Sequence, residues 1–475
     1  MKRRDFLKSC GLLVAAGSTL SLPSANASTL LTDKKEVASA ANGAKLDLKP
    51  VRALDPDTDH PVTVIVIGCG NRGQVYAKYA EKFPQGMKVV GVSDMQDIRR
   101  DYLGDKHNVP AEMRFRDFHE VFASKKKLAD AVIITTPDNL HYEPAMLALN
   151  LGYDLLLEKP VAPTEKECKA IRDLAKKKGR IVAVCHVLRY APYFVALREV
   201  AQSGLIGDIV SIQHMEPIQY AHMAHSYVRG NWRRAEDTTP IILAKSCHDL
   251  DILRWIINKP CKHIVADGDL YYFKKENAPE GAPAYCTDGC PHGDTCPYNA
   301  VSIYCKLKQH LGVFDLHGNK DPEFILSRLK DPHYNSYARC VFHCDNDQPD
   351  HYVASMLFED NITASFSMDA FCQRGGRRTR IMGTLGFIDG DGKEFRVWDF
   401  LTRTERLWNQ KVAEIPEYAD SGHGGGDLRL ARDFVEAVAH QDPNRLSSSI
   451  DVSIESHIMG FAAERSRRSG KKEKV

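Results

Sequence analysis

Residues 62–73 read Val-Thr-Val-Ile-Val-Ile-Gly-Cys-Gly-Asn-Arg-Gly, and this stretch decides the fold of the N-terminal half of the chain. The β-branched run at 62–67 predicts a strand that is buried on both faces. The pattern GxGxxG follows directly, and a helical pattern then continues to about residue 83. A strand, a glycine turn and a helix in this order are typical of a Rossmann dinucleotide site, whereas the glycine motif alone also occurs in unrelated α/β turns.

Each glycine of the motif has a separate physical task. Gly68 permits the tight turn, Gly70 lets the backbone approach a pyrophosphate, and Gly73 lets the helix and the strand pack closely. The helix N-terminus, which carries Asn71 and Arg72, then faces the anion. We therefore predict that these five residues bind the cofactor.

An acidic residue ends the second predicted strand, which spans residues 88–93. Asp94 is placed to accept hydrogen bonds from the adenosine ribose hydroxyls. A carboxylate at this point favours NAD and repels the 2′-phosphate of NADP. The sequence thus predicts NAD as the cofactor, with NADP as the weaker candidate.

Strands and helices alternate as far as residue 185, which predicts a parallel, doubly wound α/β sheet. Beyond residue 186, strand patterns follow one another without an intervening helix, which predicts a large, mostly antiparallel sheet in an α+β domain. The expected organisation is a signal peptide (1–27), a linker or arm (28–60), a Rossmann domain (61–185), a substrate-binding and oligomerisation domain (186–440) with a cysteine-rich insertion (280–345), and a C-terminal helix with a basic tail (441–475).

The composition and the N-terminus bound the class of protein. The 475 residues carry a formal net charge of only +2, which argues against a nucleic-acid partner. The first residues combine a basic start, a short apolar run and Ala25-Asn26-Ala27 as a cleavage pattern. Arg3-Arg4-Asp5-Phe6-Leu7-Lys8 resembles a twin-arginine signal, with an ordinary secretory signal as the alternative. No other apolar stretch is long enough to span a bilayer, so we expect an exported, periplasmic protein without a membrane span.

Two further motifs fall at predicted strand ends, where ligands of open α/β sheets bind. They are Thr135-Thr136-Pro137-Asp138-Asn139-Leu140-His141 and Glu158-Lys159-Pro160. From them we expect Thr136, Pro137, His141, Glu158 and Lys159 to contact the cofactor. A lysine here can stabilise the alkoxide that develops during hydride transfer, although its position alone also fits a surface residue.

This ordered set of motifs, followed by a mostly antiparallel domain, resembles the Gfo/Idh/MocA family of oxidoreductases over residues 61 to about 440. The resemblance implies an NAD-dependent enzyme that acts on CH–OH groups of carbohydrates and forms a homo-oligomer, a dimer or a tetramer. It places Lys159 beside the nicotinamide and the bound sugar, with Pro160 fixing the local backbone. It also implies that His248 is a general acid/base or orients the reacting hydroxyl. One position departs from the family, because Ala244 stands in place of an aspartate, with Lys245 next to it.

The role of Lys245 has two interpretations. A lysine near His248 lowers the pKa of the imidazole, whereas an aspartate raises it, so Lys245 could take part in proton transfer or binding. Alternatively, Lys245 forms an ion pair with Asp249 or Asp251 on the following helix. We predict Lys159, His248 and Lys245 as the catalytic residues.

Polar and aromatic residues after the Rossmann domain are candidates for sugar contacts, because aromatic faces stack on sugar rings while arginine and histidine bond hydroxyls. Most lie in the dense segment 222–233, for which a surface loop is the alternative. His423 and the glycines at 424–426 either approach the ligand or, with Asp427, cap a predicted helix at 428–439. The predicted substrate-binding residues are Arg189, Tyr190, His225, Arg229, Trp232 and Arg233.

The chain has thirteen cysteines, and the insertion concentrates them. Disulfides are the expected state of these cysteines in an exported protein. Zinc and an iron–sulfur cluster are the alternatives, although the segment lacks the CxxC pairs that are usual in such metal sites. No metal site is predicted among the catalytic and binding residues. The cysteines concerned are Cys286, Cys290, Cys296, Cys305, Cys340 and Cys344.

The leading hypothesis is hydride transfer between a tightly held NAD and a carbon of a sugar, glycoside or inositol. One alternative is a glycosidase that oxidises C3 transiently and eliminates the glycosidic bond; another is a non-catalytic sugar-binding protein. Export in the folded state predicts that NAD is loaded first and co-purifies. The arm at 28–60 could lie across the adenine side of the site and slow release, as the family resemblance suggests.

Overall fold

The computed structural model describes residues 46, 48–413 and 422–475, which belong to one compact unit. The predicted export signal and most of the arm lie outside the described residues. Among the helices of the described ranges, none combines the length and the apolar character that crossing a bilayer requires.

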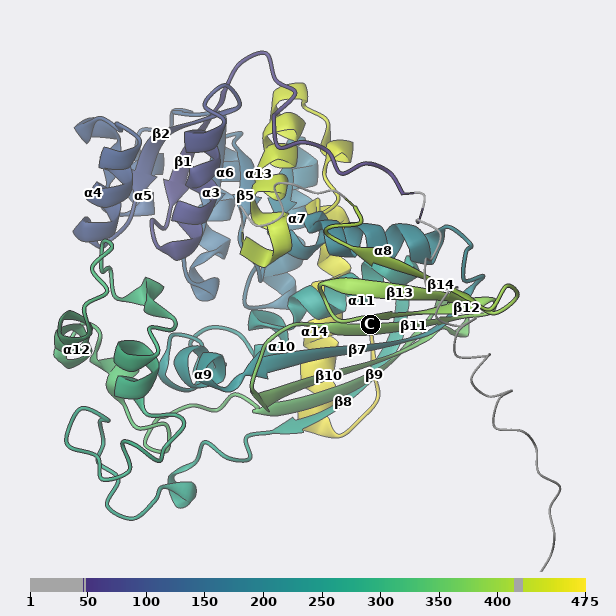
Figure 1. Ribbon diagram of the computed structural model, residues 1–475. Coiled ribbons are helices and arrows are strands. Elements are labelled where there is room, and N and C mark those ends of the chain that lie inside the picture. Colours follow the sequence, from purple (N-terminus) through teal and green to yellow (C-terminus); the bar gives the residue numbers. More distant parts are fainter. Residues whose placement is uncertain (1–45, 47, 414–421) are drawn as a thin grey trace, which may run out of the picture. The chain divides into compact units, whose positions relative to one another are not determined.

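The N-terminal domain is built on a six-stranded parallel sheet in the order β3-β2-β1-β4-β5-β6 (Figure 1). Its strands are β1 (Val62–Ile67), β2 (Met87–Ser93), β3 (Arg114–Phe115), β4 (Ala131–Ile134), β5 (Asp154–Leu157) and β6 (Val182–Val184). The connecting helices are α3 (Asn71–Lys82), α4 (Asp97–Lys106), α5 (Phe118–Ala123), α6 (Tyr142–Asn150) and α7 (Glu165–Lys178). The predicted doubly wound sheet is confirmed, and its strand order reverses between β1 and β4, where such sheets bind ligands.

Local sequence explains these elements. All four residues of β4 and of β5 are buried, as expected for central strands covered by helices on both faces. Helix α7 begins at a Thr164 side chain that accepts a hydrogen bond from the Glu167 backbone N–H. It ends at Gly179, whose φ of 61° is the left-handed conformation that terminates helices.

The second sheet has nine strands in the order β14-β13-β12-β11-β7-β10-β9-β8-β15. Its strands are β7 (Ile209–Gln219), β8 (Cys261–Asp269), β9 (His351–Phe358), β10 (Thr363–Cys372), β11 (Arg378–Gly383), β12 (Gly386–Gly390), β13 (Glu394–Asp399), β14 (Thr404–Asn409) and β15 (Glu473–Lys474). Among the described strand pairs of this nine-stranded sheet, only β7–β10 is parallel. The predicted, mostly antiparallel character of the sheet is therefore confirmed. Helix α8 (Pro192–Gln202) lies between β6 and β7 in the chain, and helices α10 (Ile241–Ala244) and α11 (Cys247–Ile257) lie between β7 and β8.

The outer face of this sheet exposes large apolar side chains at alternating strand positions. Met215, Val265, Val353 and Phe371 are each at least 38% exposed. Apolar residues gathered on a sheet face are typical of protein–protein contacts. This surface agrees with the homo-oligomer that the family resemblance implies, which stays a prediction.

The C-terminal helices depart from the expected domain division. Helix α13 (Gly422–His440) packs its Leu430, Phe434 and Val435 into the core beside β1 and α3, and therefore covers the Rossmann sheet. Helix α14 (Ile450–Ser469) packs against α7, α11 and β8. The basic tail is not frayed, because β15 pairs with β8 and Arg465 forms an ion pair with Glu473.

The described part of the arm lies on α13 and α3. The Arg52 Nη2 atom is 2.7 Å from Glu436 Oε1, and Tyr79 donates a hydrogen bond to the Leu54 carbonyl. Tyr79 belongs to the last turns of α3, at the end opposite the glycine turn. Residues 48–60 therefore do not cover the cofactor edge. Residues 28–45 and 47 of the arm lie outside the described residues, so the retention role of the arm stays a prediction.

Candidate active site

The glycine turn has the shape that a dinucleotide needs. Gly68 has a φ of +93°, and a Cβ there would lie 2.7 Å from the Thr135 carbonyl carbon. A Cβ on Gly73 would lie 2.2 Å from the Gly68 carbonyl oxygen, so this position also requires glycine. A Cβ on Gly70 would meet only the Arg99 guanidinium, at 3.7 Å, so the approach to this backbone is open. Helix α3 begins without a side-chain cap, which leaves its first N–H groups available to a pyrophosphate.

Asp94 closes the same turn from the end of β2. Its Oδ2 accepts a hydrogen bond from the Cys69 N–H and its Oδ1 accepts one from the Gln96 N–H, both at 2.8 Å. Each carboxylate oxygen keeps a second lone pair, so the group can also accept ribose hydroxyls. The position fits the predicted role and adds a structural one.

His141 joins the two strand-end motifs. Its Nδ1 is 2.7 Å from the Pro160 carbonyl oxygen, and its Nε2 is 2.9 Å from the Thr136 carbonyl oxygen. The ring is completely buried, so it fixes the loop that carries Thr136 and Pro137 against the end of β5. The predicted contact of His141 with the cofactor stays a prediction.

Arg72 and Glu158 form a buried ion pair beneath the glycine turn. Arg72 Nε donates to Glu158 Oε1 at 2.6 Å, and its Nη2 donates to Asp427 Oδ1 at 2.9 Å. Tyr76 also donates to Glu158, at 2.9 Å. Burial opposes ionisation of Glu158, but the charges of Arg72 and Lys159 outweigh it and hold the pKa of this carboxyl below its usual value. The ion pair therefore links the start of α3 to β5 and α13.

Lys159 reaches across to the second domain. Its Nζ donates a hydrogen bond of 2.6 Å to the carbonyl oxygen of Ala244, the residue that stands in place of the family aspartate. An ammonium has three protons, so two remain for a substrate oxygen. The structure thus brings Lys159 to the segment that carries Ala244, Lys245 and His248.

His248 lies in the first turn of α11 and is 5% exposed. Burial, and then the charge of Lys159, hold its pKa well below the usual value, so the ring is neutral at physiological pH. A neutral imidazole can accept a proton. Among the charged neighbours of His248, Lys159 lowers this pKa most.

Lys245 belongs instead to a buried charged group on the inner face of the second sheet. Its Nζ is 3.2 Å from Glu216 Oε1, so the expected ion pair with Asp249 or Asp251 is wrong. Arg377 bridges the two acids of this group, with its Nη2 2.5 Å from Glu216 Oε2 and its Nε 2.6 Å from Asp249 Oδ1. His214 Nε2 is 2.8 Å from the same Asp249 oxygen.

The two buried acids of this group differ in ionisation. Burial raises the pKa of Glu216 to about 7, and the neighbouring Asp249 adds to this while Arg377 and Lys245 oppose it. Burial also opposes ionisation of Asp249, but Arg377 outweighs it and holds the pKa of this carboxyl below its usual value. A carboxyl that titrates near neutral pH beside a lysine is suited to acid/base chemistry.

The segment 222–233 separates into one residue near the catalytic lysines and several that support the fold. His222 lies close enough to Lys245 and Lys159 that, after burial, their charges lower its pKa. His225 bonds the Tyr304 hydroxyl at 2.9 Å, and its ring stacks on His310 with centroids 4.9 Å apart.

The remaining predicted substrate residues are engaged with protein groups. Arg189 makes two 2.7 Å hydrogen bonds to Asp251, and Tyr190 bonds the Ser448 hydroxyl at 2.9 Å. Trp232 donates to Asp138 at 3.0 Å, and Arg233 to Asp345 at 2.9 Å. Arg229 is fully buried and donates to the carbonyl oxygens of Tyr298 and Arg339. Their sugar contacts stay predictions.

His423 and its glycines form the irregular start of α13. The φ values of His423, Gly424 and Gly425 are all positive, between 52° and 89°. The His423 ring lies 5.9 Å from that of His248 and bonds Asp427. This loop therefore approaches the candidate site, as one of its two interpretations predicts.

The cysteine-rich insertion reaches the cofactor edge without cross-links. All twelve cysteines in the described residues are free thiols, so the disulfides expected from export are not present there. The segments around Cys286 and Cys340 are held instead by backbone hydrogen bonds and by the buried Arg229. From the same insertion Asp315 pairs with Arg99 of α4 at 3.1 Å. A Cβ on Gly312 would lie 3.8 Å from Asn71 at the glycine turn.

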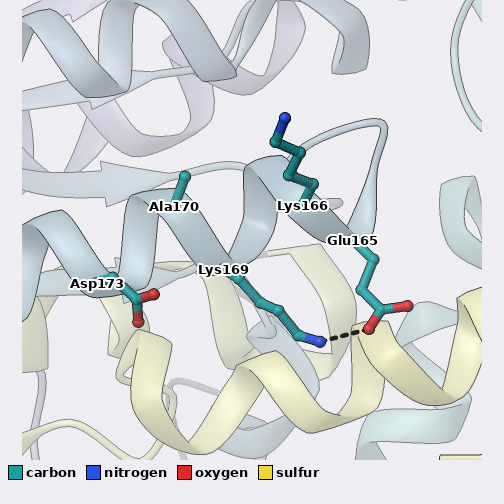
Figure 2. A pocket seen from close by; sticks show the side chains of 5 residues that line it. All are labelled: Glu165, Lys166, Lys169, Ala170 and Asp173. Carbon is teal, nitrogen blue, oxygen red and sulfur yellow. Dashed lines mark hydrogen bonds and ion pairs between the residues drawn. The ribbon is translucent and has the colours of Figure 1, made fainter.

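A surface hollow elsewhere is not part of this site. Figure 2 shows it along α7, lined by Glu165, Lys166, Lys169, Ala170 and Asp173, with Lys169 paired to Glu165 at 2.5 Å. Its lining consists of four charged side chains and one alanine, all from one helix. None of the predicted site residues lines it.

Several site residues were missed by sequence analysis: His186, His214, Glu216, Cys247, His310 and Arg377. Cys247 is two residues from Lys245, but the others are distant in the chain from Lys159 and Lys245, and the fold gathers them. The sequence did contain one indication of two of them. Along β7 the side chains alternate between buried and more exposed positions, and His214 and Glu216 fall on the same buried side as Ile212 and Ile218. Buried polar residues at such positions are rare enough to mark a site.

Comparison with known proteins identifies the N-terminal domain. Residues 62–186 match the family described as Oxidoreductase family, NAD-binding Rossmann fold (GFO_IDH_MocA). The chain is 23% identical to YteT of Bacillus subtilis over 78% of this chain and 88% of YteT. It is 31% identical to an inositol 2-dehydrogenase of Klebsiella pneumoniae, over 41% of this chain and 53% of that enzyme.

The fold also resembles solved structures over nearly its whole length. One is an inositol dehydrogenase homolog from Azotobacter vinelandii complexed with NAD+, with a TM-score of 0.63, 14% identity, and coverage of 89% of this chain and 100% of that chain. The domain at residues 62–186 therefore has the NAD-binding Rossmann fold of this oxidoreductase family, while the match to inositol dehydrogenases spans about half of their length.

Proposed function

We propose that this protein is an NAD-dependent oxidoreductase that transfers hydride between the cofactor and a CH–OH carbon of a sugar, glycoside or inositol. The observation that carries this proposal is the meeting of Lys159 and His248 at the carboxyl edge of the Rossmann sheet, with Lys159 bonded to the Ala244 carbonyl. The names of the inositol dehydrogenase relatives support the substrate class.

The residues divide the chemistry between them. NAD, when bound, accepts or returns the hydride. Lys159 has two free ammonium protons with which to hold the substrate oxygen and to stabilise its negative charge. The neutral His248 takes the hydroxyl proton during oxidation and returns it during reduction.

A second candidate is supported by Glu216 and Lys245. In a glycosidase that oxidises C3 transiently, a base must remove the acidified proton at C2, and an acid must protonate the leaving glycosidic oxygen. A carboxyl with a pKa of about 7 that contacts a lysine can supply both steps. Water then adds to the unsaturated product and the ketone is reduced again, so no NADH accumulates.

The test is to incubate the purified full-length protein in D2O with free sugars, inositols and glycosides. Absorbance of NADH and the masses of products are recorded together. A net oxidoreductase produces NADH or a keto sugar without deuterium at C2. The glycosidase releases the free sugar with deuterium at C2 and no NADH, and a protein that binds sugars but does neither is not an enzyme.

Export and cofactor retention also belong to this proposal. The twin-arginine-like signal supports passage of the folded protein to the periplasm. An exported enzyme that released NAD after each turnover would lose it by diffusion. We therefore expect NAD to stay bound, with re-oxidation by a second substrate or by the closing step of the glycosidase cycle.

A further inference from the structure

Two histidines and a cysteine converge beside Lys159. A ring nitrogen of His186, a ring nitrogen of His248 and the Cys247 sulfur all lie within 4.8 Å of one another. Within the described ranges, this is the only group of three or more His, Cys, Asp or Glu side chains with that geometry. It lies in the proposed catalytic centre, because the charge of Lys159 acts on all three side chains.

The fold holds the three side chains in place. His186 lies two residues after the end of β6, and Cys247 and His248 are the first two residues of α11. His186 and Cys247 are completely buried and His248 is 5% exposed. Since all three side chains are buried, their separation does not depend on an exposed loop.

Each of the two histidines has one buried ring nitrogen without a hydrogen-bond partner. His186 Nε2 lies 3.5 Å from the Ser456 hydroxyl and 3.6 Å from Asp251 Oδ1. A histidine with a carboxylate on one nitrogen carries its proton there and presents a lone pair on the other. That other atom, His186 Nδ1, is buried and has no hydrogen-bond partner. His248 Nδ1 is also buried without a partner.

The charges permit a cation in spite of the nearby lysine. Metal binding would require neutral imidazoles at His186 and His248, and it would displace the proton of the Cys247 thiol. The ammonium of Lys159 opposes the metal, whereas the resulting thiolate attracts it.

We propose that His186, Cys247 and His248 bind a divalent metal of borderline softness, and that this metal is zinc. Nitrogen and thiolate donors together select such metals over calcium or magnesium. Three protein ligands with one open position are typical of catalytic rather than structural zinc. Asp251 provides the carboxylate behind His186 that commonly orients a zinc-bound histidine. A part for the metal in polarising the substrate oxygen rests on the proposed function, and His248 would then hold the metal instead of taking the hydroxyl proton. The binding itself does not depend on the proposed function.

Binding is tested with cobalt as a spectroscopic probe. The full-length protein is treated with a chelator and titrated with Co²⁺, and visible and near-ultraviolet spectra are recorded. We expect saturation at one metal ion per chain, intense d–d bands and a thiolate-to-cobalt charge-transfer band. Zn²⁺ should then displace the cobalt and abolish the bands.

Matched variants locate the site. Cys247→Ser should lose the charge-transfer band, whereas Cys372→Ser, which changes a half-buried cysteine outside the cluster, should keep it. Lys159→Met should bind Co²⁺ at least ten-fold more tightly, because a neighbouring positive charge is removed. Folding of each variant is checked by circular dichroism and by NAD binding.

The results separate this proposal from the proposed function. Saturable cobalt binding that requires Cys247, in a protein without oxidoreductase or glycosidase activity, upholds the metal site and overturns the function. Activity in a chelator-treated wild-type protein that shows neither cobalt band overturns the metal site. A charge-transfer band that survives in Cys247→Ser also overturns it.

Discussion

The glycine turn and the inner face of the second sheet both supply groups to the candidate site, but by different means. The turn places Gly68, Gly70, Gly73 and the helix start within six consecutive residues. The second sheet gathers Glu216, Lys245, Asp249 and Arg377 from strands and helices that lie far apart in the chain. Cofactor binding is therefore a local property of this sequence, whereas proton handling depends on tertiary packing. Variants that affect one property and spare the other test this comparison.

The largest effect should come from the two residues at which these regions meet. We expect Lys159→Ala and His248→Ala to lower kcat by two to four orders of magnitude, about 3–5 kcal/mol, because each removes a group that handles charge on the reacting oxygen. Bound NAD, measured after denaturation, should stay near the wild-type amount. Lys169→Ala is the control and should keep full activity; this lysine pairs with Glu165 on α7, away from the candidate site (Figure 2). Near-normal turnover in either site variant would remove that residue from the mechanism.

The same contrast explains what the sequence could predict. The strands predicted at 62–67 and 88–93 are decided by buried apolar runs in short segments, so their prediction succeeded. Lys159 and His248 were found because each sits in a short motif with a family resemblance.

Other features could not be read from the sequence because they depend on long-range contacts. The partner of Lys245 is on β7 rather than on its own helix. Helix α13 follows the second domain in the chain but covers the first. In both cases several partners were compatible with the local pattern, and only the topology decides between them.

The next effect concerns the pH dependence of the inner-face group. If Glu216 acts as a base, kcat/KM should rise with pH through about 7, and Glu216→Gln should lose this acid limb together with about ten- to hundred-fold of activity. Lys245→Ala removes a charge that favours the carboxylate, so the acid limb should move to higher pH. A pH profile that is unchanged in both variants would restrict the group to a structural role.

The pH dependence of the protein's folding stability gives an independent check on the pKa of Glu216. Its pKa rises from an ordinary 4.5 to about 7 on folding, so between these values the folded state binds a proton that the unfolded state lacks. The free energy of unfolding should therefore fall as pH rises from about 5 to 7. Urea titrations should show a smaller fall in Glu216→Gln than in the wild type. An equal slope in both proteins would place the titration elsewhere.

A smaller effect is expected at the cofactor end of the comparison. Asp94→Ala should weaken NAD binding by about ten-fold, or 1.4 kcal/mol, and reduce discrimination against NADP. The carboxylate also accepts the Cys69 and Gln96 N–H groups, so a moderate loss of thermal stability should accompany the change. Calorimetric titration with both cofactors measures the effect. Unchanged affinity for both would remove Asp94 from the site, and a change in kcat alone would contradict the division between the two regions.

The smallest expected effect lies where the insertion of the second domain meets the glycine turn of the first. Asp315 pairs with Arg99 at 3.1 Å, and Gly312 stands beside Asn71, so this segment is placed to slow NAD release. A partly buried ion pair contributes about 1 kcal/mol, so Asp315→Ala should release bound NAD about five-fold faster in a dilution assay. Asp294→Ala, which breaks the exposed pair with Lys306 in the same insertion, is the matched control.

Wild-type protein purified without added NAD should carry the dinucleotide, which is quantified after denaturation. If the wild type is already free of NAD, the retention proposal fails, whatever the variants do; if it carries NAD and Asp315→Ala releases it no faster than Asp294→Ala, retention stands but its cause is the turn itself.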